Sequence, residues 1–125
     1  MLNKIMLIGN LGKDPELNVT AEGTPVTKFS LAVNRKYKAS SGELKEETEW
    51  FNIVTWRQLA EICERYLHKG SKVYIEGRLT QRKYPDKTGI ERTAVEVIAN
   101  DMQMLDSKQP EASTTEISEA FLPDE

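Results

Sequence analysis

Residues 49–70 read EWFNIVTWRQLAEICERYLHKG, and the period of the apolar residues changes in the middle of this stretch. Its first part, residues 49–56, is rich in aromatic and β-branched residues and predicts a strand. In residues 58–68 the apolar side chains fall at i, i+3, i+4, i+7 and i+8, which predicts one face of a helix. Gly70 is well placed as a left-handed terminator of that helix, and the His-Lys pair before it suits the negative end of the helix dipole.

The segments on either side of this stretch predict a sheet. Strands are expected at residues 4–10, 26–33, 49–56, 71–84 and 90–105, with a short extended piece at 17–20. The polar, aperiodic residues 38–47 predict an exposed loop at a hairpin tip, and residues 85–89 predict a turn. About five strands, with one short helix between the third and the fourth, is the element order of an all-β OB-fold barrel.

The length of 125 residues fits one domain, which we assign to residues 1–105. Residues 106–125 carry one basic and six acidic side chains, a net charge of −5, and predict a disordered acidic tail. Residues 1–105 carry 16 basic and 14 acidic side chains, so the overall charge of −3 hides a slightly basic body of +2. The single cysteine and the short apolar N-terminal stretch predict a soluble, cytoplasmic protein with no membrane segment.

The sequence offers no catalytic or metal-binding set. His68 is the one histidine and Cys63 the one cysteine, and this pair cannot form a zinc site with standard ligand spacing. Cys63 lies on the apolar face of the expected helix and is predicted to be a buried thiol. Gly9 and Gly12 are too close together for the glycine spacing of a phosphate loop. We therefore expect no enzymatic activity, no cofactor and no metal.

Aromatic side chains beside cations are the positive signal. In residues 71–84 the odd-numbered positions are apolar or small and suit a barrel interior; they include Val73, Ile75, Gly77 and Leu79. The even-numbered positions are then expected outside, among them Lys72, Tyr74, Arg78, Arg82 and Tyr84. Residues 26–33 alternate in the same way, with Lys28, Ser30 and Ala32 opposite the apolar side.

Trp50 and Trp56 share one side of their strand, while large apolar side chains also occupy the other side. The alternation of side chains along this strand therefore leaves open which of its two sides faces the core. The general preference for large apolar residues in the core favours burial of both tryptophans. Their exposure is favoured by Asn52, which shares their side, and by Arg57 next to Trp56.

An outward row of aromatic rings interleaved with arginine and lysine suits unpaired nucleic acid. Every base has a π-face, so stacking works without sequence preference and contributes about 1–3 kcal/mol per base, while cations neutralise phosphates. Duplex bases already stack on each other, so such a surface would select single strands.

Four blocks of the sequence resemble bacterial-type single-stranded DNA-binding proteins. They lie in order and span most of residues 3–105: NKIMLIGNLGKDPE at 3–16, TEWFNIV at 48–54, KGSKVYIEG at 69–77 and MQML at 102–105. The resemblance implies an OB-fold, a homotetramer, and roles in DNA replication, recombination and repair. It also implies that Trp50 and Trp56 lie outside and stack on bases, with weaker stacking on Tyr37 and Tyr84.

The same resemblance implies which cations contact phosphates. They are Arg35, Lys69, Lys72, Arg78, Arg82 and Lys83, with Arg57 as a further candidate. Replication and repair proteins would dock on the acidic tail, although this chain ends in Phe121–Glu125 rather than in the Pro-Phe of the family. The alternative function is an OB-type protein-interaction paralogue used mainly for assembly.

Overall fold

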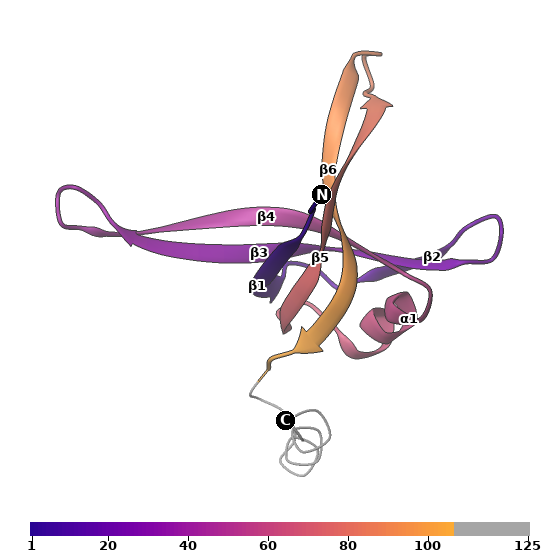
Figure 1. The fold of residues 1–125 in the computed structure, drawn as a ribbon, viewed down its shortest axis with the longest axis horizontal. Helices are drawn as coiled ribbons and strands as arrows, with labels where there is room; N and C mark the ends of the chain where they lie inside the picture. The colour runs from indigo at the N-terminus through magenta and orange to yellow at the C-terminus, as the bar shows by residue number, and fades with distance from the viewer. Residues whose placement is uncertain (107–125) are drawn as a thin grey trace, which may run out of the picture.

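One strand pairs on both of its edges and closes the sheet into a barrel. In a computed structural model, which describes residues 1–106, the elements are β1 (Ile5–Leu11), β2 (Glu16–Val19), β3 (Pro25–Lys38), β4 (Leu44–Trp56), α1 (Arg57–Tyr66), β5 (Lys72–Pro85) and β6 (Glu91–Met104). β1 pairs antiparallel with β5 along most of its length and with β3 at its last two residues. The order β1-β5-β6-β4-β3 then returns to β1, so five strands form a closed ring (Figure 1).

The short strand β2 continues the course of β1 along β3. Leu11 of β1 pairs with Leu31, and Glu16 of β2 pairs with Lys28 further along the same strand. Residues 12–15 interrupt the two strands, and the Gly12 N–H donates to the Ser30 carbonyl at 3.0 Å. Counted as one interrupted strand, β1 and β2 bring the total to five, with α1 between the third and the fourth. The predicted OB-fold is confirmed.

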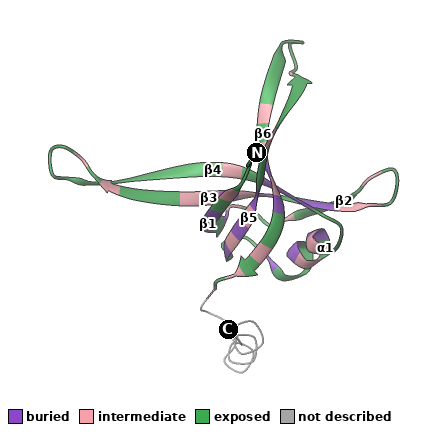
Figure 2. Ribbon diagram, in the orientation of Figure 1, coloured by how far each residue is buried: buried purple, intermediate pink, exposed green. Residues whose placement is uncertain are grey.

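The core lies where the strands cross inside the ring, and α1 covers one end of it. Leu31, Ile53, Val73 and Ile75 are fully buried there. Cys63 of α1 packs against this cluster, and burial raises the pKa of its thiol to about 11. The predicted inward side of residues 71–84 is confirmed as far as Gly77. Leu79, however, is exposed because β5 leaves the barrel at that point (Figure 2).

Two long hairpin arms extend from the barrel, one formed by β3 and β4 and the other by β5 and β6, and β2 forms a shorter hairpin with the start of β3 (Figure 1). The loop predicted at 38–47 is wrong in extent, because β4 already begins at Leu44 and only residues 39–43 connect the strands. The outer lengths of both arms are mostly exposed (Figure 2). A strand exposed on both faces has no alternation of polar and apolar residues, so the period that identifies strands is missing there.

The helix ends earlier than the sequence predicts. Leu67 follows the last helical residue with an extended backbone (φ −97°, ψ 154°), and its side chain is buried in the core. Gly70 does adopt a left-handed conformation, with φ 93°, but it lies in the turn after Leu67 and does not terminate the helix. The basic residue in the last helical turn is Arg65 rather than His68 or Lys69. Leu67 is therefore buried by the extended chain that leaves the helix, and not as part of the helical face that the periodicity predicts.

The tail predicted at 106–125 lies, apart from Asp106, outside the described residues. Its boundary with the domain at residue 105 stays a prediction.

The junction between β4 and α1 passes through a strained residue. Arg57 has φ 60°, the one non-glycine residue with positive φ in residues 1–106. A side chain in this left-handed region costs about 1–2 kcal/mol, because Cβ approaches the following carbonyl oxygen. The N-cap residue Trp56 makes no side-chain capping hydrogen bond. The chain therefore turns from strand into helix at this point without a capping side chain.

We predict that Arg57→Gly raises the free energy of unfolding by about 1 kcal/mol, because glycine has no Cβ to strain. Arg57→Ala is the matched control, since it removes the same side chain and keeps the strain. Urea unfolding of the two variants and the parent protein measures the effect. Equal stabilities of the glycine and alanine variants would contradict the prediction.

Candidate nucleic-acid interface

The outer face of the barrel is one continuous surface across four strands. Ser30 of β3 pairs with Asn52 of β4, Asn52 pairs with Glu96 of β6, and Glu96 pairs with Thr80 of β5. Directly paired residues point to the same side of a sheet, and side chains alternate along each strand. The even-numbered residues of β3, of β4, of β5 from Arg78 onward and of β6 up to Ile98 therefore share one side. We call this side the outer face.

Both tryptophans lie on the outer face and outside the core. Trp50 is 60% exposed and Trp56 38% exposed, whereas Ile53 and Thr55 on the other side of β4 are fully buried. The six-membered ring of Trp50 lies against Gly12, where a Cβ would stand only 2.5 Å from Cζ3 of the indole. The absence of a side chain at Gly12 therefore leaves room for this ring. The arrangement implied by the family resemblance, with the tryptophans outside, is the one observed.

Three arginines lie beside aromatic rings, two of them near Trp56 and one near Tyr84. Arg78 pairs with Ile98, and both line a hollow together with Trp56 and Arg57. Further along β5, the Arg82 guanidinium lies 5.6 Å from the centre of the Tyr84 ring. Arg57, Arg78 and Arg82 thus place positive charge beside aromatic rings of this surface.

A second hollow on the outer face contains cations that the sequence argument did not select. Lys13 and Lys28 line it together with Asn52 and Glu96. Lys28 could have been found, because it lies with Ser30 and Ala32 on the side of residues 26–33 that is opposite the apolar side. Lys13 lies in the interruption between β1 and β2, where no period indicates a direction.

Lys69 and Lys72 lie around the β1 end of the barrel. The backbone N–H of Lys69 donates to a carboxylate oxygen of Asp14 at 2.7 Å, which places this residue beside the second hollow. Lys72 pairs with Asn10 of β1, at the opposite end of β5 from Tyr84. Lys69 is thus near the outer face, and Lys72 is on the flank formed by β1 and β5.

The remaining predicted residues do not share the outer face. Arg35 and Tyr37 pair with Glu47 and Lys45, which are odd-numbered residues on the opposite side of the β3–β4 arm. Lys83 pairs with Thr93 on the opposite side of the β5–β6 arm. The sequence thus indicated cations and aromatic rings on both arms, but it did not show which side of each arm they occupy.

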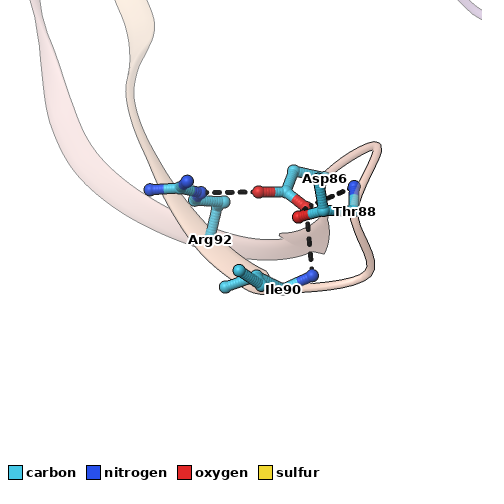
Figure 3. Close-up of polar contacts among 4 residues, drawn as sticks. All are labelled: Asp86, Thr88, Ile90 and Arg92. Carbon is cyan, nitrogen blue, oxygen red and sulfur yellow. Dashed lines mark hydrogen bonds and ion pairs between the residues drawn. The ribbon is translucent and has the colours of Figure 1, made fainter.

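The tip of the β5–β6 arm is ordered by one carboxylate, as Figure 3 shows. One Asp86 oxygen accepts hydrogen bonds from the backbone N–H groups of Thr88 and Ile90 and from the Thr88 hydroxyl. The other oxygen accepts from Nε of Arg92 at 2.8 Å. Arg92 pairs across the arm with Tyr84, so this network adjoins the aromatic ring. Composition predicted the turn but not the contact with Arg92.

We predict that the tip keeps its structure down to about pH 4, near the pKa of an ordinary aspartate. Hydrogen bonds from Thr88 and Arg92 lower the pKa of Asp86 to about 2. A carboxyl group with a lowered pKa stabilises the fold above its unfolded value, and this stabilisation is lost as pH falls through the folded value. The amide resonances of Thr88 and Ile90 should therefore shift only below about pH 4. They should lose this titration in Asp86→Asn, and a midpoint near the ordinary aspartate value would contradict the network.

No group of three or more His, Cys, Asp or Glu side chains suited to a metal ion occurs in residues 1–106. In the same part of the chain, no helix has the length and apolar character that a membrane span needs.

A closed five-stranded barrel with one helix defines an OB-fold protein. The chain belongs to the single-strand binding protein family, whose model matches residues 2–105. Membership agrees with the prediction of a binding protein rather than an enzyme.

Named relatives and a solved structure agree with this assignment. Single-stranded DNA-binding protein 1 of Chlorobaculum tepidum is 52% identical over 118 residues, which cover 94% of this chain and 73% of the relative. The single-stranded DNA-binding protein of Neisseria meningitidis serogroup A is 44% identical over 120 residues, covering 96% and 69%. The structure of a Plasmodium falciparum SSB complex with ssDNA aligns with a TM-score of 0.78 and 36% identity, over 85% of this chain and 96% of that one.

Proposed function

We propose that this protein binds single-stranded DNA without sequence preference, along the outer face of the barrel. The observation that carries the proposal is the exposure of Trp50 and Trp56 on the same sheet face as Arg78 and Arg82. Such a protein would protect strands that are exposed during replication, recombination and repair. Membership of the single-strand binding protein family supports this function.

The chemistry of the face accounts for the preference for single strands. Unpaired bases offer their π-faces to the indole rings, and each stacked base contributes about 1–3 kcal/mol. The arginines and lysines neutralise phosphates and release counterions, which makes binding weaken as salt rises. Neither contact reads the edge of a base, so the sequence of the strand has little influence.

The proposed contacts extend beyond the outer face. Bases stack on Trp50, Trp56 and Tyr84, and a strand that passes round the edge of the β3–β4 arm reaches Tyr37. The phosphate contacts are assigned to Arg35, Arg57, Lys69, Lys72, Arg78, Arg82 and Lys83, and we add Lys13 and Lys28 from the hollow beside Asn52. The division of these residues between two sides of each arm supports a wrapped strand rather than a straight one.

Replacing both Trp50 and Trp56 by alanine should weaken binding to oligo-dT by about 2–6 kcal/mol, because two stacked bases lose their rings. Fluorescence anisotropy of an end-labelled oligonucleotide measures the affinity without relying on the protein's tryptophans. Tyr66→Ala is the control, since it removes an exposed ring from α1, outside the outer face.

Two outcomes favour the alternative function, an interaction module used mainly for assembly. One is that the parent protein fails to bind oligo-dT at low salt. The other is that the double variant binds as tightly as Tyr66→Ala. The DNA would then bind elsewhere, or stacking on the two tryptophans would not contribute to the affinity.

We also propose that the protein assembles as a homotetramer, as the family resemblance implies. The outward side of β1 supports an interface, because its successive outward residues Met6 and Ile8 are 62% and 52% exposed. Ile8 pairs with Tyr74 of β5, so the apolar surface continues onto the next strand. A second copy of the chain would cover these side chains.

Replacing Met6 and Ile8 together by lysine should reduce the assembly, because two charges would be buried in the interface. Light scattering coupled to size exclusion measures the mass. Leu17→Lys, on β2, introduces an exposed charge away from β1 and should leave the mass unchanged. A parent protein that is already monomeric would overturn this part of the proposal.

A cytoplasmic location with the nucleoid is part of the same proposal. So is the docking of replication and repair proteins on the acidic tail, which lies outside the described residues apart from Asp106.

A further inference from the structure

The same arrangement of three side chains occurs on both hairpin arms. On the β3–β4 arm, the Arg35 guanidinium lies 4.9 Å from the centre of the Tyr37 ring, and its Nη2 donates to Oε1 of Glu47 at 2.7 Å. Arginine and tyrosine are two residues apart on one strand, and the glutamate is on the partner strand, directly opposite the arginine. The pKa of Arg35 is raised, first by its hydrogen bond to Glu47.

On the β5–β6 arm, the corresponding residues are Arg82, Tyr84 and Glu96. Nη2 of Arg82 lies 3.2 Å from Oε2 of Glu96, and the guanidinium lies over the Tyr84 ring. The glutamate is again on the partner strand, here diagonal to the arginine, because Arg82 pairs with Ala94. Each arm therefore presents one arginine that is held between a ring and a carboxylate.

These ion pairs contribute little to the stability of the fold. The side chains of Arg35 and Glu47 are 65% and 49% exposed, so water and salt screen this pair. Arg82 is 56% exposed and is screened from its own side, whereas its partner Glu96 is only 15% exposed. A carboxylate on a surface that binds a polyanion also repels the ligand. Glu96 nevertheless lines the second hollow of the outer face, beside Lys28 and Asn52. Stability alone does not account for carboxylates at these two positions.

We propose that Glu47 and Glu96 act as internal substitutes for phosphate, which occupy Arg35 and Arg82 until a strand binds. In the free protein each carboxylate holds its arginine over the tyrosine ring, in the place where stacking and phosphate binding are needed together. When a strand binds, a phosphate oxygen replaces the carboxylate on the guanidinium. This inference rests on the proposed function, because it requires a single-stranded nucleic acid on these arms.

The exchange has a consequence for the dependence of binding on salt. A phosphate that meets a free arginine releases a counterion, with a slope of log K against log[salt] near −0.7 for each phosphate of a single strand. A phosphate that displaces a carboxylate leaves that carboxylate free to take up a cation from solution. The net release of ions is then smaller, so the glutamates weaken binding at low salt and flatten its salt dependence.

The test compares Glu47→Gln and Glu96→Gln with two controls, Glu43→Gln and Glu91→Gln. Each control removes one negative charge from the same hairpin as its partner variant, and neither Glu43 nor Glu91 forms an ion pair within residues 1–106. Affinity for an end-labelled oligo-dT is measured by anisotropy over a series of salt concentrations. Thermal unfolding of all four variants verifies that the fold is kept.

Glu47→Gln and Glu96→Gln should each bind about two- to fivefold more tightly than the matched control at low salt, the size expected for an exposed ion pair. Their salt slopes should be steeper by up to about 0.7, and the gain in affinity should vanish at high salt. A purely structural role would change the unfolding temperature without steepening the slope.

The outcomes separate this inference from the proposed function. If the parent protein binds oligo-dT but the two variants bind no more tightly than Glu43→Gln and Glu91→Gln, the exchange of carboxylate for phosphate is overturned and the function stands. Weaker binding by the variants, with an unchanged slope, would also overturn it. Failure of the parent protein to bind oligo-dT would overturn the function itself.

Discussion

Closure of the barrel through β1 is the constraint on which the rest of the structure depends. β1 pairs with β5 and also reaches β3, so its backbone passes very close to a neighbouring strand. At Gly9 a Cβ would stand 2.3 Å from the carbonyl oxygen of Ala32, which leaves room only for glycine. Once the ring is closed, the part of each strand within the barrel has one side turned to the core and one to solvent.

The sequence predicted much of this arrangement where one face of a strand is buried. Val73 and Ile75 lie inside as their alternation indicates, and the helix fills its expected place in the order of elements. The tryptophans could not be placed from their strand alone, because large apolar side chains occupy both of its sides. Packing inside the barrel decides which side of β4 is buried. Ile53 faces the core, and Trp50 lies against Gly12 at the surface.

The parts of the hairpin arms that the sequence missed have a common physical cause. Where the hairpins leave the barrel, both faces of the strands meet water and no hydrophobic period remains to mark them. The extent of β4 and the two sides of each arm, including the position of Tyr37 opposite the outer face, were therefore not predictable from periodicity. Pairing register supplies this information, because it assigns each residue a partner and a side.

The separation of barrel and arms has a consequence for the dynamics of the molecule. All the fully buried large side chains of the described residues belong to the barrel and α1, so the distal halves of the arms have no hydrophobic core of their own. Regions with few buried apolar contacts open locally at low free energy while the rest of a protein stays folded. Amide hydrogens near the tip at residues 39–43 would therefore exchange with solvent long before those of Ile53 or Val73. The residues that reach furthest from the barrel can thus adapt their shape without loosening the structure that carries them.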